Sequence, residues 1–477
     1  MQHVWRITLF LTMIINKIKY QTVKPSLRGI NHFPPEVKTS GCTDAPKIRR
    51  ERAFSTRKKI DMQKRAAFNW YLNNIVIFLI LICLFAFPCM GQSQDKKTIE
   101  QRIIKHIVNG SVVLLDEGGS PLISHRADEL FVPASIIKIL TSAIAYDILG
   151  ADYRFKTEIF VNLEGDIAVK GWGDPYLISE EIELIAKALS GRGVNSIGRV
   201  YLDHSSFTDL LKIPGISLTA NPYDALNGAL VVNFNTLNLK KNGRGEVSSA
   251  EEITPLTPLA LVKASNLKSG STQRFNLSAN PQECRRYAGE LFIAILENNG
   301  IAVQERSVNN IRVNNKNWSL IYTHLNTNDM AAINTGLQKY SNNFIANQLF
   351  LTIGAARKGY PATLEKGKEA FEEHISSHLK IPAGQLVMEE GSGISRNNKV
   401  SANVMVQILR ERKEQLAELL PEKRGALAKS GTLAGVSNYA GYIKTKNGLR
   451  PYAVMLNQNS SNRDAVLDLL VEYCKDD

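Results

Sequence analysis

Two strand–turn–strand patterns near opposite ends of the patterned part of the chain constrain the fold more than any other feature. The first covers residues 110–126, where apolar and β-branched residues flank a Gly-Gly turn. The second covers residues 435–458, with a turn at Asn447–Gly448, and a helical pattern follows over 462–473. One antiparallel sheet with helices packed against it is the simplest way to bury both hairpins. We therefore predict an α+β fold whose sheet joins these two distant segments.

The region between the hairpins has two parts. Residues 160–320 alternate short apolar runs with turn residues, with one clear helical pattern near Tyr287–Glu297. Helical patterns return from Asp329, where a polar stretch separates two helices. We predict one or two β-rich lobes inserted into a sheet-and-helix domain. The predicted boundaries are 165–320 for the insertion and 92–164 with 321–477 for the domain around it.

The positive charge of the chain lies almost wholly at its beginning. The net charge is +13, but residues 1–91 hold 15 Lys/Arg against 4 Asp/Glu, and the remainder holds 43 against 41. Nucleic-acid binding needs a cationic face on the folded domain. The charge distribution therefore gives no support to a nucleic-acid partner.

The basic segment ends in an export pattern. Lys64 and Arg65 precede an apolar run over 75–87, which is shorter than the roughly 20 residues that span a bilayer. We predict a signal peptide over 62–91, cleaved near Gly91, and an exported protein of the periplasm or cell envelope whose membrane contact is at most peripheral. Residues 1–61 are then a basic leader, and Met62 is an alternative start. Acylation of Cys83 or Cys89 is the competing interpretation, but neither cysteine follows a small residue.

Cysteine and histidine usage indicates neither a disulfide framework nor a metal site. Only Cys284 and Cys474 follow the predicted signal peptide, and pairing or separate burial are both compatible with the sequence. No zinc-type spacing links them to the scattered histidines. We expect no metal and no cofactor.

Ser135 and Lys138 open an apolar helical pattern. The pattern follows Pro133, which suits a helix entrance, and ends at Gly150. Residues three apart face the same side of a helix, so the two side chains can meet. The spacing alone is weak evidence, because the chain holds five such pairs: Ser55/Lys58, Ser93/Lys96, Ser135/Lys138, Ser265/Lys268 and Ser377/Lys380. In isolation, such a serine is ordinarily a helix N-terminal residue and such a lysine a surface residue.

Two further short motifs follow in order along the chain. Ser341-Asn342-Asn343 lies at the break between the two predicted helices, and Lys429-Ser430-Gly431-Thr432 enters the terminal hairpin. Each motif is weak alone, because similar triplets occur elsewhere. The setting of each favoured copy, and their order, indicate a shared site.

At these residues the chain resembles the penicillin-recognising serine enzymes, which carry this set of motifs. Finer features resemble the D-alanyl-D-alanine carboxypeptidase/endopeptidase family of low-molecular-mass penicillin-binding proteins, which have a large insertion after the first motif. These features are "PAS" before Lys138, "GWGDPYL" from Gly171 and "EGSGISRNN" from Glu390. The family usually has Asp at position 390, Leu at 394 and Thr at 430, and Ser430 keeps the hydroxyl group.

The resemblance implies a serine β-lactamase/DD-peptidase-like fold and an acyl-enzyme reaction. Ser135 is the expected nucleophile and Lys138 its base, provided that burial and the charge of Lys429 keep the Lys138 amine neutral. Ser341 is expected to relay a proton toward the leaving amine. The backbone N–H groups of Ser135 and Thr432 are the expected oxyanion hole.

The resemblance also implies how substrate is held. Asn343 is expected to hold the substrate amide and Lys138, and the third motif is expected to bind the substrate carboxylate through Lys429, Ser430, Gly431 and Thr432. The expected substrates are peptidoglycan stem peptides, and the expected inhibitors are β-lactams. Two alternatives stay open: a serine β-lactamase, and a catalytically weak module that binds cell wall or senses β-lactams.

Overall fold

The computed structural model describes residues 62, 64–78, 95–209, 211–382 and 384–475. The predicted leader, most of the predicted signal peptide and its cleavage point near Gly91 lie outside these residues. Residues 64–78 form a helix that belongs to a separate unit of the chain. Among the described residues, none of the helices combines the length and the apolar character needed to cross a membrane.

The main sheet joins the two predicted hairpins. It has six strands in the order β16-β17-β18-β19-β1-β2, and β1 pairs antiparallel with β19, for example Val112 opposite Val454. Its strands are β1 (Gly110–Leu115), β2 (Pro121–His125), β16 (Glu422–Lys423), β17 (Ala426–Leu433), β18 (Val436–Thr445) and β19 (Gly448–Leu456). The prediction of an α+β fold with one antiparallel sheet is confirmed.

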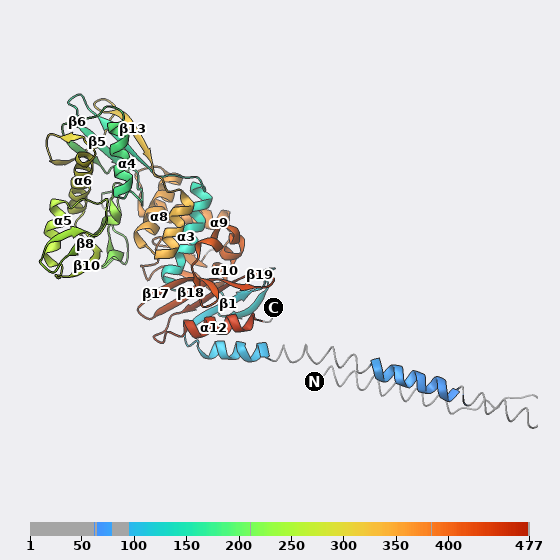
Figure 1. The fold of residues 1–477 in the computed structure, drawn as a ribbon. Helices are drawn as coiled ribbons and strands as arrows, with labels where there is room; N and C mark the ends of the chain where they lie inside the picture. The colour runs from blue at the N-terminus through green and yellow to red at the C-terminus, as the bar shows by residue number, and fades with distance from the viewer. Residues whose placement is uncertain (1–61, 63, 79–94, 210, 383, 476–477) are drawn as a thin grey trace, which may run out of the picture. The chain divides into compact units, whose positions relative to one another are not determined.

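Both faces of this sheet are buried against other elements. Side chains of a strand alternate between the two faces of its sheet, so neighbouring residues enter different cores. On β1, Val113 and Leu115 belong to the large core shared with the central helices, whereas Val112 and Leu114 belong to a core shared with α12. Figure 1 shows α10 and α12 on opposite sides of the sheet. The helices of the domain around the main sheet are α3 (Lys138–Leu149), α7 (Met330–Tyr340), α8 (Asn343–Lys358), α9 (Leu364–Ser377), α10 (Ala402–Glu411), α11 (Lys413–Leu416) and α12 (Arg463–Tyr473), with a further helix over 95–105.

The middle of the chain forms a second sheet, of five strands in the order β12-β7-β5-β4-β13. The strands are β4 (Lys156–Val161), β5 (Ile167–Gly171), β7 (Val200–Asp203), β12 (Val308–Asn310) and β13 (Ser319–Leu325). The predicted boundaries at 165 and 320 cut through this sheet, because β4 and most of β13 lie outside them. Only long-range pairing, such as Phe160 opposite Leu320, shows that β4 and β13 belong to this sheet.

A third sheet, in the order β10-β8-β9, and three helices complete the middle region. The helix expected near Tyr287–Glu297 begins earlier, at Pro281, because the Asn280 side chain accepts a hydrogen bond from the Gln282 N–H and caps it. The other two helices were not anticipated from sequence. The elements are β8 (Thr236–Lys241), β9 (Val247–Ser249), β10 (Ser271–Asn276), α4 (Ser179–Ser190), α5 (Pro258–Lys263) and α6 (Pro281–Asn298).

Short elements connect these layers. The short strands are β3 (Leu130–Phe131), β6 (Ser196–Ile197), β11 (Ala302–Val303), β14 (Leu386–Val387) and β15 (Lys399–Ser401). The 3-10 turns are η1 (Ala134–Ile137), η2 (Pro222–Asp224), η3 (Asn233–Asn235), η4 (Ala264–Asn266) and η5 (Ala417–Leu419). Cys284 and Cys474 are buried in different core clusters and are not joined to one another.

Candidate active site

Ser135 lies on a tight turn that is fastened to the main sheet. The turn is the 3-10 segment η1, and α3 begins only at Lys138, so Ser135 precedes the α-helix that the sequence predicted to contain it. The buried Asn438 side chain on β18 donates hydrogen bonds to the carbonyls of Val132 (2.9 Å) and Pro133 (2.8 Å). These bonds fix the backbone immediately before Ser135 against the sheet.

The Lys138 amine is fully buried and has oxygen atoms of three different segments around it. Its Nζ lies 2.8 Å from Ser135 Oγ, 2.8 Å from Asn343 Oδ1 and 2.6 Å from the Ser392 carbonyl oxygen. Burial, followed by the nearby charge of Lys429, holds the pKa of Lys138 well below its usual value of 10.5, and the Glu390 carboxylate acts in the opposite direction.

The arrangement suits a neutral amine that accepts a proton from serine. A neutral amine has two N–H bonds and one lone pair. The amide oxygen of Asn343 and the carbonyl oxygen of Ser392 can only accept hydrogen bonds, so they take both N–H bonds. The remaining lone pair is then available to the hydroxyl group of Ser135, which can donate.

The second motif lies at the junction of α7 and α8. Ser341 has a left-handed backbone conformation (φ 53°), and the Asn342 side chain caps α8 by accepting from the Ile345 N–H. The Lys429 amine donates a hydrogen bond to Ser341 Oγ at 2.8 Å. The second and third motifs therefore touch directly, although they are far apart in the chain.

Asn343 connects Lys138 to the inserted region. Its Oδ1 accepts from Lys138, while its Nδ2 makes a longer contact, 3.4 Å, with the carbonyl of Tyr223. Tyr223 belongs to η2 and exposes about half of its side chain. The middle of the chain therefore reaches the site through this loop.

The third motif lies on β17, an inner strand of the main sheet next to β16. Lys429 is buried, and burial lowers its pKa from 10.5 to about 8. Ser430 is half-buried, Gly431 is buried and Thr432 is exposed. The three motifs thus meet at one place, with the direct contacts Lys138–Ser135, Lys138–Asn343 and Lys429–Ser341.

Two neighbouring residues were not singled out for the site by sequence reasoning. Arg463, at the start of α12, donates hydrogen bonds to Thr432 Oγ1 (2.7 Å) and to the Gly431 carbonyl (3.2 Å). It adds a second cation beside the third motif. Glu390 was noted as the start of "EGSGISRNN" and as a departure from the family pattern, without a role in the site, yet it is fully buried close to Lys138. Neither residue has a local sequence signal, because its relevance depends on packing between distant segments.

The other Ser-x-x-Lys pairs that the structure describes lack such surroundings. Ser265 and Lys268 are both exposed. Ser377 ends α9 and donates to the Glu373 carbonyl, and Lys380 is exposed. Only the Ser135 copy, among the described pairs, has a buried lysine.

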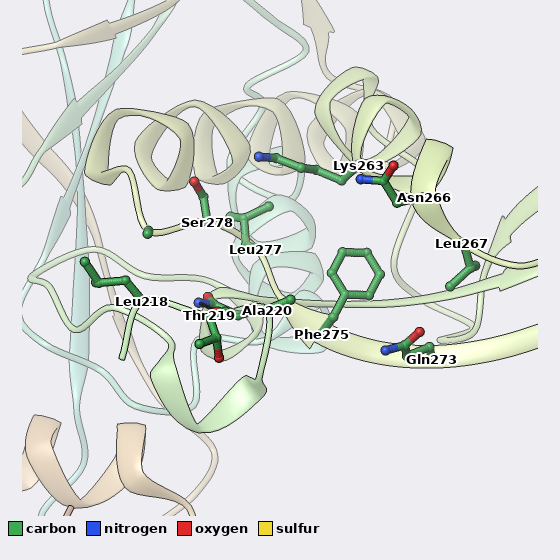
Figure 2. Close-up of a pocket in the computed structure, with 12 residues that line it drawn as sticks. Leu218, Thr219, Ala220, Lys263, Asn266, Leu267, Gln273, Phe275, Leu277 and Ser278 are labelled. Carbon is green, nitrogen blue, oxygen red and sulfur yellow. Dashed lines mark hydrogen bonds between the residues drawn. The ribbon is translucent and has the colours of Figure 1, made fainter. Parts of the chain in front are cut away.

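A separate pocket of about 420 Å³ lies in the middle region, and none of the predicted site residues lines it. Figure 2 shows its walls, which include Leu218, Lys263 and Phe275. The Lys263 amine is paired with Glu283 at 2.6 Å. Among the described residues, no cluster of three or more His, Cys, Asp or Glu side chains is arranged to hold a metal ion.

Comparison with known families shows which family the chain belongs to. Residues 94–421 match the D-Ala-D-Ala carboxypeptidase 3 (S13) family, a range that covers well over half of the chain. The chain belongs to this family. The predicted family is therefore confirmed, and the chain is a serine-type carboxypeptidase of the S13 family. The matched range ends at residue 421, before the third motif.

Curated relatives match over most of their length. A D-alanyl-D-alanine carboxypeptidase of Actinomadura sp. (strain R39) is 25% identical over 450 residues, covering 79% of this chain and 83% of the relative. The D-alanyl-D-alanine carboxypeptidase DacB of Haemophilus influenzae is 25% identical over 403 residues, covering 72% and 81%.

The fold is also that of a solved member of the group. The crystal structure of penicillin-binding protein 4 (DacB) from Haemophilus influenzae aligns with a TM-score of 0.63 at 19% identity. The alignment covers 79% of this chain and 98% of that structure. At this level of identity the likeness concerns the fold alone.

Proposed function

We propose that this S13 enzyme cleaves the terminal D-alanyl-D-alanine bond, or a D-alanyl cross-link, of peptidoglycan stem peptides through an acyl-enzyme formed on Ser135. The observation that carries this proposal is the buried Lys138 amine, whose neighbours leave its lone pair for the Ser135 hydroxyl. The names of the curated relatives, D-alanyl-D-alanine carboxypeptidases, support the choice of substrate.

In the first step Lys138 takes the hydroxyl proton as Ser135 Oγ bonds to the carbonyl carbon of the scissile amide. The N–H groups of Ser135 and Thr432 stabilise the negative charge that develops on the carbonyl oxygen. The carbon–nitrogen bond then breaks. The proton held by Lys138 returns to the leaving nitrogen, with Ser341 as relay. Water later hydrolyses the ester and restores Ser135.

The substrate carboxylate is bound by the third motif. Lys429 supplies a buried cation, whose attraction for a carboxylate is weakened little by water. Ser430 and Thr432 supply hydroxyl groups. Arg463, which contacts Thr432, raises the positive potential there further. A β-lactam carries a carboxylate beside a strained amide, so it should bind at the same site and acylate Ser135. We expect water to hydrolyse the resulting ester slowly.

The proposal includes export and a separate inserted lobe. The pattern over 62–91 supports a signal peptide, and a peptidoglycan substrate requires a location in the cell envelope. The second and third sheets with α4 to α6 share a hydrophobic core of their own, although Phe207, Ala229 and Val231 of the same segment join the large core of the main domain. This core supports a separate lobe that runs from β4 to β13, wider than the predicted 165–320.

The test is incubation of the exported chain with a labelled penicillin, followed by peptide mapping, together with release of D-alanine from a peptide ending in D-Ala-D-Ala. We expect a long-lived label on the peptide that contains Ser135, D-alanine release, and loss of both in Ser135→Ala. Rapid turnover of the penicillin would indicate a β-lactamase instead. Absence of both adduct and D-alanine release would indicate a binding module.

A further inference from the structure

The Glu390 carboxylate organises the loop that faces Lys138. It is fully buried and accepts hydrogen bonds at both oxygens. Oε2 accepts from the N–H (2.7 Å) and the hydroxyl (2.5 Å) of Ser392. Oε1 accepts from the N–H groups of Gly393 (2.7 Å) and Ser395 (3.2 Å) and from Asn398 Nδ2 (2.6 Å). A carboxylate can accept several hydrogen bonds at once, because each of its two oxygens has more than one lone pair.

The same loop is fastened to both helices that carry the reactive groups. The Gly391 carbonyl accepts from Thr141 on α3 (2.7 Å), and the Gly391 N–H donates to Asn347 on α8 (2.8 Å). The loop also lies directly on the Ser135 turn, because a Cβ atom at Gly393 would fall 2.0 Å from the Ala134 carbonyl oxygen. A displacement of this loop would therefore be felt at the nucleophile and at its base.

Ser392 connects the Glu390 carboxylate to the Lys138 amine. Its N–H and hydroxyl are both held by Glu390, and its carbonyl oxygen accepts from Lys138 Nζ at 2.6 Å. This carbonyl is one of the two acceptors that occupy the N–H bonds of a neutral Lys138. If it moved away, the amine could rotate and its lone pair would no longer be held toward Ser135.

We propose that Glu390 is a positioning residue for Lys138, which fixes the Ser392 carbonyl so that the lone pair of the amine faces the Ser135 hydroxyl. The inference rests on the proposed function, in which Lys138 is the base. It deepens that proposal by naming the group that orients the base.

Glu390 also acts on Lys138 through its charge. The charged groups that influence the amine are Lys429 on β17, which lowers the pKa of Lys138, and Glu390, which raises it. The neighbouring helices α7 and α8 contribute neutral side chains. Gln338 donates to the Lys138 carbonyl, and Asn343 accepts from the Lys138 amine. Replacing Glu390 by a neutral side chain should therefore lower the pKa of Lys138 further, and the base would become neutral at lower pH.

The experiment is the pH dependence of acylation by a labelled penicillin for the whole exported chain and its variants. Glu390→Gln should reduce the maximal acylation rate by about 10²-fold, because misplacement of a reacting group by about 1 Å has an effect of this size. The acid limb of its pH profile, over which the rate rises as Lys138 loses its proton, should also move to lower pH. Glu390→Asp keeps the charge, so its acid limb should stay near that of the parent protein while its maximal rate falls less than in Glu390→Gln.

Glu389→Gln is the matched control. Glu389 precedes Glu390, and its carboxylate accepts from Ser395 Oγ (2.6 Å) and Asn397 Nδ2 (3.1 Å). Within the described residues, neither of these hydrogen bonds involves the Ser392 carbonyl or Lys138. The control should keep both the maximal rate and the acid limb. A structural role of Glu390 alone would lower the rate of Glu390→Gln equally at every pH.

The outcomes separate this inference from the proposed function. A parent maximal rate in folded Glu390→Gln, with Lys138→Ala inactive, would overturn the positioning role only, and an unshifted acid limb would overturn the charge effect of Glu390. Acylation that survives in Lys138→Ala would overturn the proposed base itself. Should Glu390→Gln fail to fold, Glu390→Asp decides, because a shifted acid limb in this charge-retaining variant would contradict the inference.

Discussion

A Cβ atom on Gly431 would lie 2.6 Å from the carbonyl oxygen of Pro133 and 3.1 Å from the backbone nitrogen of Ser135. The third motif therefore needs glycine, because β17 lies directly against the turn that carries Ser135, the proposed nucleophile. We predict that Gly431→Ala pushes the turn and the strand apart and slows acylation by about 10²-fold.

The control for this substitution is Gly243→Ala. Gly243 has an ordinary backbone conformation and no atom within 4 Å of an added Cβ. It should keep the parent acylation rate with labelled penicillin. Normal acylation in folded Gly431→Ala would show that the close approach is unimportant for the reaction.

The rate of acylation by a D-Ala-D-Ala peptide should depend on pH with two limbs. The acid limb follows from Lys138, which must be neutral to act as a base and whose pKa lies well below 10.5. The alkaline limb follows from Lys429, whose pKa is lowered to about 8 and whose cation is lost above that pH. Because the two amines influence one another, the limbs report on the pair. Lys429→Arg should remove the alkaline limb, since arginine stays protonated.

Substitution of Lys138 should separate its charge from its basicity. Lys138→Ala should slow acylation by about 10²- to 10⁴-fold, the usual contribution of general-base assistance. Lys138→Arg should fail as well, because arginine keeps a positive charge that it cannot give up in a protein. Lys429→Arg should retain part of the rate. The measurement is the acylation rate of each variant after a folding check by circular dichroism, and near-parent acylation in Lys138→Arg would exclude Lys138 as the base.

The other serines with the same spacing should be dispensable. Ser265→Ala and Ser377→Ala should both be acylated at the parent rate, because each serine is followed by an exposed lysine. Stoichiometric labelling with penicillin checks this. Loss of the label in either variant would identify a different nucleophile.

The exported protein should begin close to Gln92. This expectation follows from the apolar run over 75–87 and the proposed cleavage near Gly91. N-terminal sequencing of protein collected from the cell envelope tests it. A mature chain that includes residues before Met62 would contradict both the signal peptide and the alternative start.

Much of the catalytic domain was predictable from local patterns. The hairpins at 110–126 and 435–458 and the helix after Pro133 follow from side-chain periodicity and turn residues, which depend on neighbours in the chain. The Ser135–Lys138 contact is also local, because residues three apart on a helical turn face the same side. The order of the three motifs indicated the penicillin-recognising serine enzymes, and the finer features such as "GWGDPYL" indicated the family.

The insertion was less predictable. β4 and most of β13 were placed outside it, because a strand has no local mark that tells which sheet it joins. The helix α4 was not recognised among short apolar runs, although its buried residues Ile182, Ile185 and Leu189 repeat at helical spacing.

The chemical types of the proposed site residues were determined by the sequence alone, whereas the surroundings that set their protonation were decided by tertiary structure. A lysine becomes a neutral base only where water is excluded, and Lys138 is enclosed by segments that contribute Asn343, Ser392 and Lys429 from far along the chain. The same holds for Glu390, whose buried charge and five donors exist only once the loop has closed over α3 and α8. Desolvation and hydrogen-bond direction depend on distances between remote segments, and no local pattern of residues encodes those distances.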